Sequence, residues 1–172
     1  MIDVMKFSCY LWSQLLLYNR RLMMRSAEEE IRWFRDVLPR ICDRETSMDP
    51  DRWTPENPLH AHCSVVSLLA HDIFGGEIIE ASIEQGPGFE RRGIHYWNKL
   101  SNGREEDFTK GQFKNDAPIF NNYPSVRTRA WIFQVSPVAF KRYMLLCERF
   151  FNHISNGRWQ RCYLKDPRTR SA

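Results

Sequence analysis

The sequence lacks a paired set of cysteines. It has five cysteines, an odd number, and none of them forms a Cys-x-x-Cys pair. This composition argues against a disulfide framework and favours free thiols in a reducing compartment, so we expect a cytoplasmic protein. The five positions are Cys9, Cys42, Cys63, Cys147 and Cys162.

Long apolar runs and a strong charge of one sign are also missing. The partly apolar stretch 7–18 is too short to span a bilayer and carries no small-x-small cleavage site. The 25 Lys and Arg exceed the 21 Asp and Glu by only four, and no nucleic-acid motif accompanies them. We therefore expect no transmembrane segment, no specific nucleic-acid partner and no cofactor.

The chain shows no internal repeat and no low-complexity segment. Its 172 residues are 42 % apolar and 27 % charged, which suits one packed domain. We expect that domain to cover residues 26–157. Residues 1–25 would be an N-terminal extension that can lie outside the fold, and residues 158–172 a basic, disordered tail. The oligomeric state stays open.

The first predicted helix has a clear start. Ser26 followed by Glu29 is a capping box, and apolar residues recur at helical spacing as far as residue 38. Pro39 has no N–H to donate within a helix, so we expect the helix to end there.

Two more helices are predicted further along the chain. The run 63–74 is apolar over most of its circumference, which predicts a central, buried helix closed by the glycines that follow. The last helix begins at Pro137, a residue that suits a first turn, and runs to about residue 153. Asn156-Gly157 would stop it.

Strands are predicted between these helices, over segments 77–83, 93–100 and 104–109. Segment 85–92 is a predicted loop, and segment 114–130 is predicted to be irregular. The resulting fold class is α+β, with a small antiparallel β-sheet packed against the central helix that carries Cys63 at its N-terminus.

Three candidates for a thiol active site occur in the order Cys63, His95, Asp107. Cys63 opens the apolar helix, where the helix dipole and free backbone N–H groups favour an anion. His95 interrupts an aromatic strand, and Asp107 follows a turn. A thiol nucleophile needs a base, and the base needs a group that fixes its tautomer. We therefore predict a catalytic triad that acts on an amide or ester carbonyl.

The turn between the last two strands decides whether His95 and Asp107 meet. If Ser101-Asn-Gly103 is a three-residue loop, the two side chains share one face of the sheet. If Asn102-Gly103 is a two-residue turn, Asp107 points to the opposite face and the triad fails. The glycine at the third loop position favours the longer turn.

Six short segments surround these residues: Trp53-Thr-Pro-Glu-Asn-Pro58, Cys63-Ser-Val-Val-Ser-Leu-Leu69, Phe74-Gly-Gly-Glu77, Gly93-Ile-His-Tyr-Trp-Asn98, Asp107-Phe-Thr109 and Gln112-Phe113. As a set they resemble the YunG-like family of small, uncharacterised bacterial proteins. The resemblance covers about residues 53–113. It carries no established activity over to this chain.

The resemblance also bears on the residues beside the cysteine. In that family the cysteine usually ends a Gly-Gln-Cys triplet, and here the triplet is Ala61-His62-Cys63. His62 thus stands where a glutamine could donate to an oxyanion, and a histidine N–H can substitute for it.

A more distant resemblance concerns the fold. A helix-borne cysteine followed by His and Asp on neighbouring strands is similar to the papain and transglutaminase-like fold, which includes peptidases, amidases, deamidases and acyltransferases. Fold alone does not determine function. Trp53, Tyr96 and Trp97 are the candidates for lining the cleft.

Two other functions stay open on the sequence alone. His60, His62 and Cys63 are possible zinc ligands, but their spacing fits no standard finger, and His71 lies about two helical turns, roughly 12 Å, from Cys63. We therefore assign no metal ligands, and a metal-binding protein stays an alternative. The remaining alternative is a binding or regulatory module that keeps the fold without the chemistry.

Overall fold

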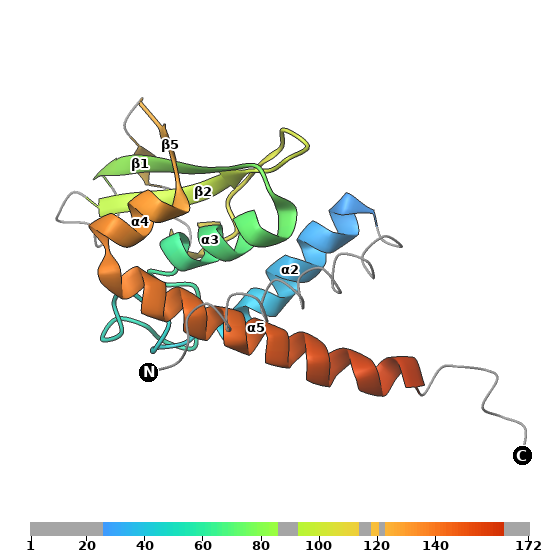
Figure 1. Cartoon of the computed structure of the whole chain (residues 1–172). Helices are drawn as coiled ribbons and strands as arrows, with labels where there is room; N and C mark the ends of the chain where they lie inside the picture. The colour runs from blue at the N-terminus through green and yellow to red at the C-terminus, as the bar shows by residue number, and fades with distance from the viewer. Residues whose placement is uncertain (1–25, 86–92, 114–117, 121–122, 164–172) are drawn as a thin grey trace, which may run out of the picture.

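A computed structural model describes residues 26–85, 93–113, 118–120 and 123–163, and this part of the chain has a mixed α+β fold (Figure 1). An antiparallel sheet forms one layer. Helix α3 (Cys63–Phe74) packs beneath it and lies between the sheet and the long helix α5 (Pro137–Tyr163). The predicted class and the central, cysteine-bearing helix are therefore confirmed.

Strand β1 (Glu77–Gln85) is the centre of the sheet and pairs on both sides. On one side it runs antiparallel to β2 (Gly93–Lys99), with Ala81 opposite His95. On the other side it pairs first with β5 (Ser125–Arg127) and then with β4 (Ile119–Phe120). The short strand β3 (Glu105–Glu106) extends the sheet beyond β2.

The two faces of β2 carry side chains with different roles. Asn98 faces the helical layer, and its side-chain amide donates to the carbonyl of Ser67 in α3 over 3.0 Å. His95 lies three residues before Asn98 in the same strand. Successive side chains of a strand point to opposite faces, so His95 projects from the other face. The bond from Asn98 fixes β2 on α3 and thereby fixes where His95 lies relative to the start of that helix.

Helix α2 (Ala27–Ile41) begins as the capping box predicts, with Ser26 and Glu29 bonded reciprocally. The predicted end was wrong, since Pro39 lies inside the last turn. Pro39 removes only its own N–H, while burial of Ile41 and the bond from the Cys42 N–H to the Leu38 carbonyl hold that turn together.

Segment 114–130 contains more regular structure than predicted. The described residues include β4, β5 and the start of helix α4 (Arg129–Val135), whose first turn the Thr128 side chain caps. Strands of two or three residues are too short to show an alternation of apolar and polar residues in the sequence. They are defined by their pairing with β1. Segment 104–109 is also mostly not strand: β3 ends at Glu106, and a 3-10 turn, η1 (Lys110–Phe113), follows.

The last helix is longer than predicted. Helix α5 continues through Asn156-Gly157 to Tyr163, so the first residues of the predicted basic tail are helical. A glycine inside a helix costs only about 1 kcal/mol, which does not stop a long helix by itself. The predicted extension over 1–25 and the rest of the tail lie outside the described residues.

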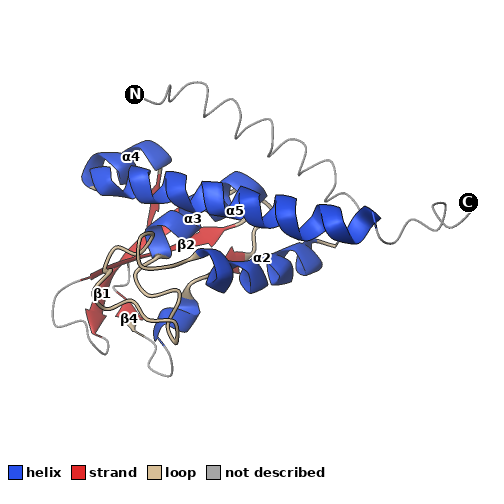
Figure 2. Cartoon of the chain, turned by 90° about the horizontal axis from the view of Figure 1, so that it is seen from below, coloured by secondary structure: helices blue, strands red, loops and turns tan. Residues whose placement is uncertain are grey.

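Figure 2 shows α5 running across the helical layer, over α3 and alongside α2. Fully buried Phe34, Leu68 and Phe150 join these three helices in one apolar core. Among the helices that the structure describes, none is long and apolar enough to cross a membrane.

Candidate functional site

Cys63 is the first residue of α3, the position predicted for a nucleophile. Its thiol is free and partly exposed, and its sulfur lies 3.9 Å from the Ile94 carbonyl oxygen of β2. The other two described thiols, Cys42 and Cys147, are buried, and burial raises the pKa of both. No side chain is described for Cys9 or Cys162. Of the described cysteines, Cys63 alone is open to a reagent.

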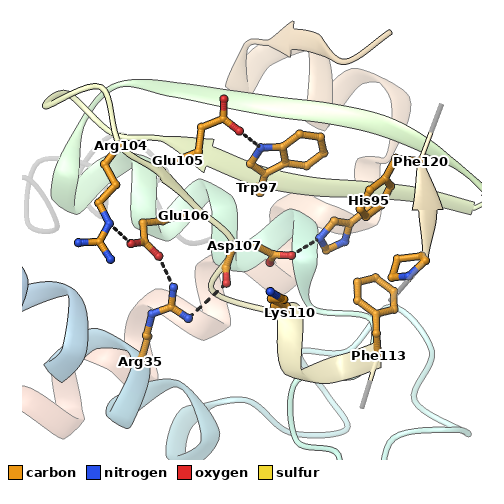
Figure 3. A pocket seen from close by; sticks show the side chains of 11 residues that line it. Arg35, His95, Trp97, Arg104, Glu105, Glu106, Asp107, Lys110, Phe113 and Phe120 are labelled. Carbon is orange, nitrogen blue, oxygen red and sulfur yellow. Dashed lines mark hydrogen bonds and ion pairs between the residues drawn. The ribbon is translucent and has the colours of Figure 1, made fainter. Parts of the chain in front are cut away.

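His95 and Asp107 meet directly. The His95 Nε2 atom and the Asp107 Oδ2 atom are 2.8 Å apart, as Figure 3 shows. Between the strands, Leu100 donates its N–H to the Arg104 carbonyl and Gly103 adopts a φ of 83°. The three-residue turn is therefore confirmed, and it brings both side chains to one face.

Asp107 is held on both sides of its carboxylate. Its Oδ1 atom accepts from the backbone N–H of Thr109 at 2.9 Å and from the Thr109 hydroxyl at 3.1 Å. Arg35 of α2 donates to the Asp107 carbonyl at 3.4 Å and pairs with Glu106 (Figure 3). These contacts leave Oδ2 directed at His95, so the carboxylate is fixed in position.

His95 is the electrostatic centre of the site. Its side chain is 1 % exposed. Burial alone would lower the pKa of the imidazole, but hydrogen bonds with Asp107 and with the Cys63 thiol outweigh it and raise the pKa to about 9. A carboxylate only accepts, so Nε2 carries a proton and Nδ1 is the nitrogen left for the thiol. The structure thus brings Cys63, His95 and Asp107 together.

Gln112 links the two halves of the site, a position that pattern analysis did not assign. Its Oε1 atom accepts from the Ala61 N–H at 3.2 Å, which directs Nε2 to within 3.4 Å of His95 Nδ1. The same Nε2 also lies 3.1 Å from the Thr109 hydroxyl. The sequence indicates Gln112 only as part of one family-like segment, because Ala61 and His95, the partners that give it a place in the site, lie 51 and 17 positions away.

His62 does not face the cavity that Cys63 lines. Its ring is fully buried, with Nδ1 bonded to the His60 carbonyl at 2.8 Å and Nε2 to the Thr46 hydroxyl at 2.9 Å. Both ring nitrogens are occupied, so the ring has no free N–H for an oxyanion. Next to it, Ala61 adopts a φ of 58°, a conformation that favours glycine. This explains physically why a glycine would suit that place in the triplet.

The three aromatic candidates occupy different places. Tyr96 lines the cavity beside Cys63, where burial and then Glu80 raise the pKa of its hydroxyl. Trp97 stacks near His95 on the other side and donates to Glu105 at 3.2 Å (Figure 3). Trp53 donates to the Pro58 carbonyl at 3.0 Å and lines neither cavity, so it stabilises the loop before Cys63.

Two cavities meet at His95. One, of about 660 Å³, lies on the Asp107 side between Trp97, Lys110 and Phe120 (Figure 3). The other, of about 630 Å³, is lined by Cys63, Gln112 and apolar side chains. His95 lines both, which places its imidazole between the thiol and the carboxylate. A substrate carbonyl could reach the sulfur from the second cavity.

The metal alternative finds little support in this geometry. Within the described residues, no group of three His, Cys, Asp or Glu side chains is placed to hold a metal ion. His62 is turned into its own hydrogen bonds, as described above. His71 lies near the other end of α3.

Comparison with known proteins places this small α+β protein, with its helix-borne cysteine, in a family. A family model described as "YunG protein" matches residues 30–155. The chain is also similar to the uncharacterised protein YunG of Bacillus subtilis strain 168, with 31 % identity over 121 residues, 70 % of this chain and 90 % of that protein. The chain belongs to the YunG family.

The more distant resemblance is not supported. No solved structure matches the chain, so the likeness to the papain and transglutaminase-like fold has no neighbour to rest on. What stands is the family and the mixed α+β fold with its curled antiparallel sheet.

Proposed function

We propose that this protein is a cysteine-dependent hydrolase or acyltransferase that acts on an amide or ester carbonyl. The observation that carries the proposal is the place of His95, which is bonded to the Asp107 carboxylate at 2.8 Å and lines one cavity together with Cys63. A nucleophile, a base and an orienting carboxylate in this order are what covalent thiol catalysis needs. A likeness to papain and transglutaminase-like enzymes belongs to the proposal and rests on this arrangement alone.

The proposed reaction has two steps. Before the attack, His95 already carries the proton that it shares with Cys63. The Cys63 sulfur attacks the carbonyl carbon as the thiolate and forms a C–S bond. The bond to the leaving amine or alcohol then breaks, and His95 gives its Nδ1 proton to that group. Water or an amine next attacks the thioester and gives its proton to His95, and the C–S bond breaks, which releases the acyl group and restores the pair of thiolate and imidazolium.

The start of α3 offers donors for the developing oxyanion. The backbone N–H groups there have no partner within the helix, and they point toward the end that carries Cys63. The side-chain amide of Gln112 also lines the cavity, but its Nε2 is already bonded to Thr109 and His95. In this proposal the helix N–H groups take the role that the His62 ring cannot take.

The test is acylation by p-nitrophenyl acetate. We expect the parent to release nitrophenolate and to carry an acetyl group on Cys63, located by peptide mass mapping. Cys63→Ala should abolish both signals, and Asp107→Asn should slow release by about 100-fold or more, in the range of a general base. The exposed Asp36→Asn is the matched control and should behave as the parent. Acetylation of Cys63 at the same rate in Asp107→Asn would contradict the proposal.

The second candidate is a binding module without chemistry. The observation that favours it is the cavity beside Cys63, whose size and largely apolar walls suit a small molecule. A protein that binds a ligand there while Cys63 stays unacylated would belong to this class.

A further inference from the structure

The cavity beside Cys63 contains a buried cation with almost no partners. Arg142 of α5 lines this cavity and is 8 % exposed. Among the residues that the structure describes, its only hydrogen bond is a long one, 3.4 Å from Nη1 to the Thr46 carbonyl. The Nε atom is buried and has no partner among those residues. A guanidinium has five N–H donors, so most of its capacity is unused.

No carboxylate neutralises Arg142 among the residues that the structure describes. Asp49 is the acid among the described residues that line the same cavity, and it lies 3.9 Å from Arg52 and 3.5 Å from His60. An unpaired buried charge is costly, and proteins commonly offset this cost with a partner. The described part of the chain therefore leaves Arg142 with the capacity to bind an anion.

Other features of the cavity also point to a ligand. Ser136 lines it, and its buried hydroxyl oxygen, like the Nε atom of Arg142, has no partner in the described part of the chain. The walls between these polar groups are largely apolar and include Met48, Ile94 and Trp131. A few converging polar groups in an apolar pocket are typical of small-molecule sites.

We infer that Arg142 binds a carboxylate of the substrate, so the substrate is a small amide or ester that carries a free carboxylate and an apolar acyl part. This inference rests on the proposed function, because it names the substrate class of that same site. The carboxylate pairs with the guanidinium, the apolar part lies along the walls, and the reacting carbonyl faces Cys63.

Electrostatics agree with this assignment. Burial lowers the pKa of Arg142, and the neighbouring Cys63 is the opposing influence. A bound carboxylate would relieve the cost of that burial. Arginine suits this role better than lysine, because its planar fork binds both carboxylate oxygens.

The experiment is calorimetric titration of the full chain with pentanoate and with pentanamide, its uncharged analogue. We expect pentanoate to bind about tenfold more tightly or better, as one charge-assisted hydrogen bond allows. In Arg142→Gln that preference should disappear, while Lys141→Gln should keep it. Lys141 is the adjacent, exposed residue of α5, so its variant removes the same charge outside the cavity.

Each outcome decides the inference. The inference would be overturned if the parent showed no preference for pentanoate, or if Lys141→Gln lost that preference as much as Arg142→Gln does. The comparison in the parent does not depend on the folding of any variant. Arg142→Lys tests the positive charge without the planar fork of the guanidinium. The inference and the proposed function fail separately. A pentanoate preference without acylation of Cys63 removes the enzyme, whereas acylation without the preference removes only the role of Arg142.

Discussion

At the scale of single residues, the site depends on which polar atoms are already occupied. His95 uses Nε2 for Asp107, so Nδ1 is left for Cys63. His62 has neither ring nitrogen to spare. Two histidines 33 positions apart thus have opposite roles for reasons of hydrogen bonding: one is set up as a base, and the other is part of the scaffold.

The buried ring of His62 makes the free energy of unfolding decrease as the pH falls. Burial lowers its pKa from 6.5 to about 4, so the unfolded chain takes up the proton first as pH falls. The stabilisation is complete above pH 6.5 and is lost between pH 6.5 and 4, by up to about 3 kcal/mol. His62→Gln cannot titrate, so its free energy of unfolding should fall less over this range. Urea denaturation at pH 7 and at pH 4.5 measures the difference.

An equal loss of stability in the parent and in His62→Gln would show that other groups cause the acid sensitivity. In that case the ring of His62 would not be held neutral by burial.

At the scale of elements, the connection from α3 to β1 passes close to the end of β2. Gly76 has a φ of 89°, and an added Cβ would lie 2.1 Å from the Lys99 carbonyl oxygen. Gly103, in the hairpin turn, has a similar φ of 83° but open space around it. A comparison of the two positions therefore separates the cost of a left-handed backbone conformation from the cost of steric overlap.

We predict that Gly76→Ala destabilises the protein much more than Gly103→Ala. The turn variant should lose about 1–2 kcal/mol, the cost of a left-handed conformation with a side chain. Gly76→Ala adds a clash with rigid backbone and should lose more than about 4 kcal/mol or fail to fold. Chemical denaturation of both variants measures the gap. Similar losses in both would mean that the chain does not approach itself closely at Gly76.

The elements also show what could be predicted from sequence. The capping box at Ser26 and the three-residue turn are local, and both were predicted correctly. The ends of α2 and α5 and the strands β4 and β5 were not, because burial and long-range pairing determine them. Periodicity has no information about partners that are distant in sequence.

At the scale of the whole molecule, the site is assembled from distant parts of the chain. Cys63 comes from α3, His95 from β2, Gln112 from η1 and Arg142 from α5. Chain order and residue type were enough to nominate Cys63, His95 and Asp107. Gln112 and Arg142 were not nominated for a role, because their functions follow from a cavity that only the packed layers create.

The measurement that tests the central claim most directly is the pH dependence of Cys63 alkylation by iodoacetamide. The reaction is followed by peptide mass mapping in the parent and in His95→Gln. An imidazolium beside a sulfur favours the thiolate, and His95 keeps its proton up to a pH of about 9. We predict that Cys63 of the parent reacts about tenfold faster or more at pH 6.5 than Cys63 of His95→Gln.

The buried Cys42 serves as the internal reference and should stay unmodified in both proteins while they are folded. If Cys63 reacts with the same rate and the same pH profile in the parent and in His95→Gln, His95 does not activate the thiol. That result would contradict the account. A fast reaction at pH 6.5 that depends on His95 is the result it predicts.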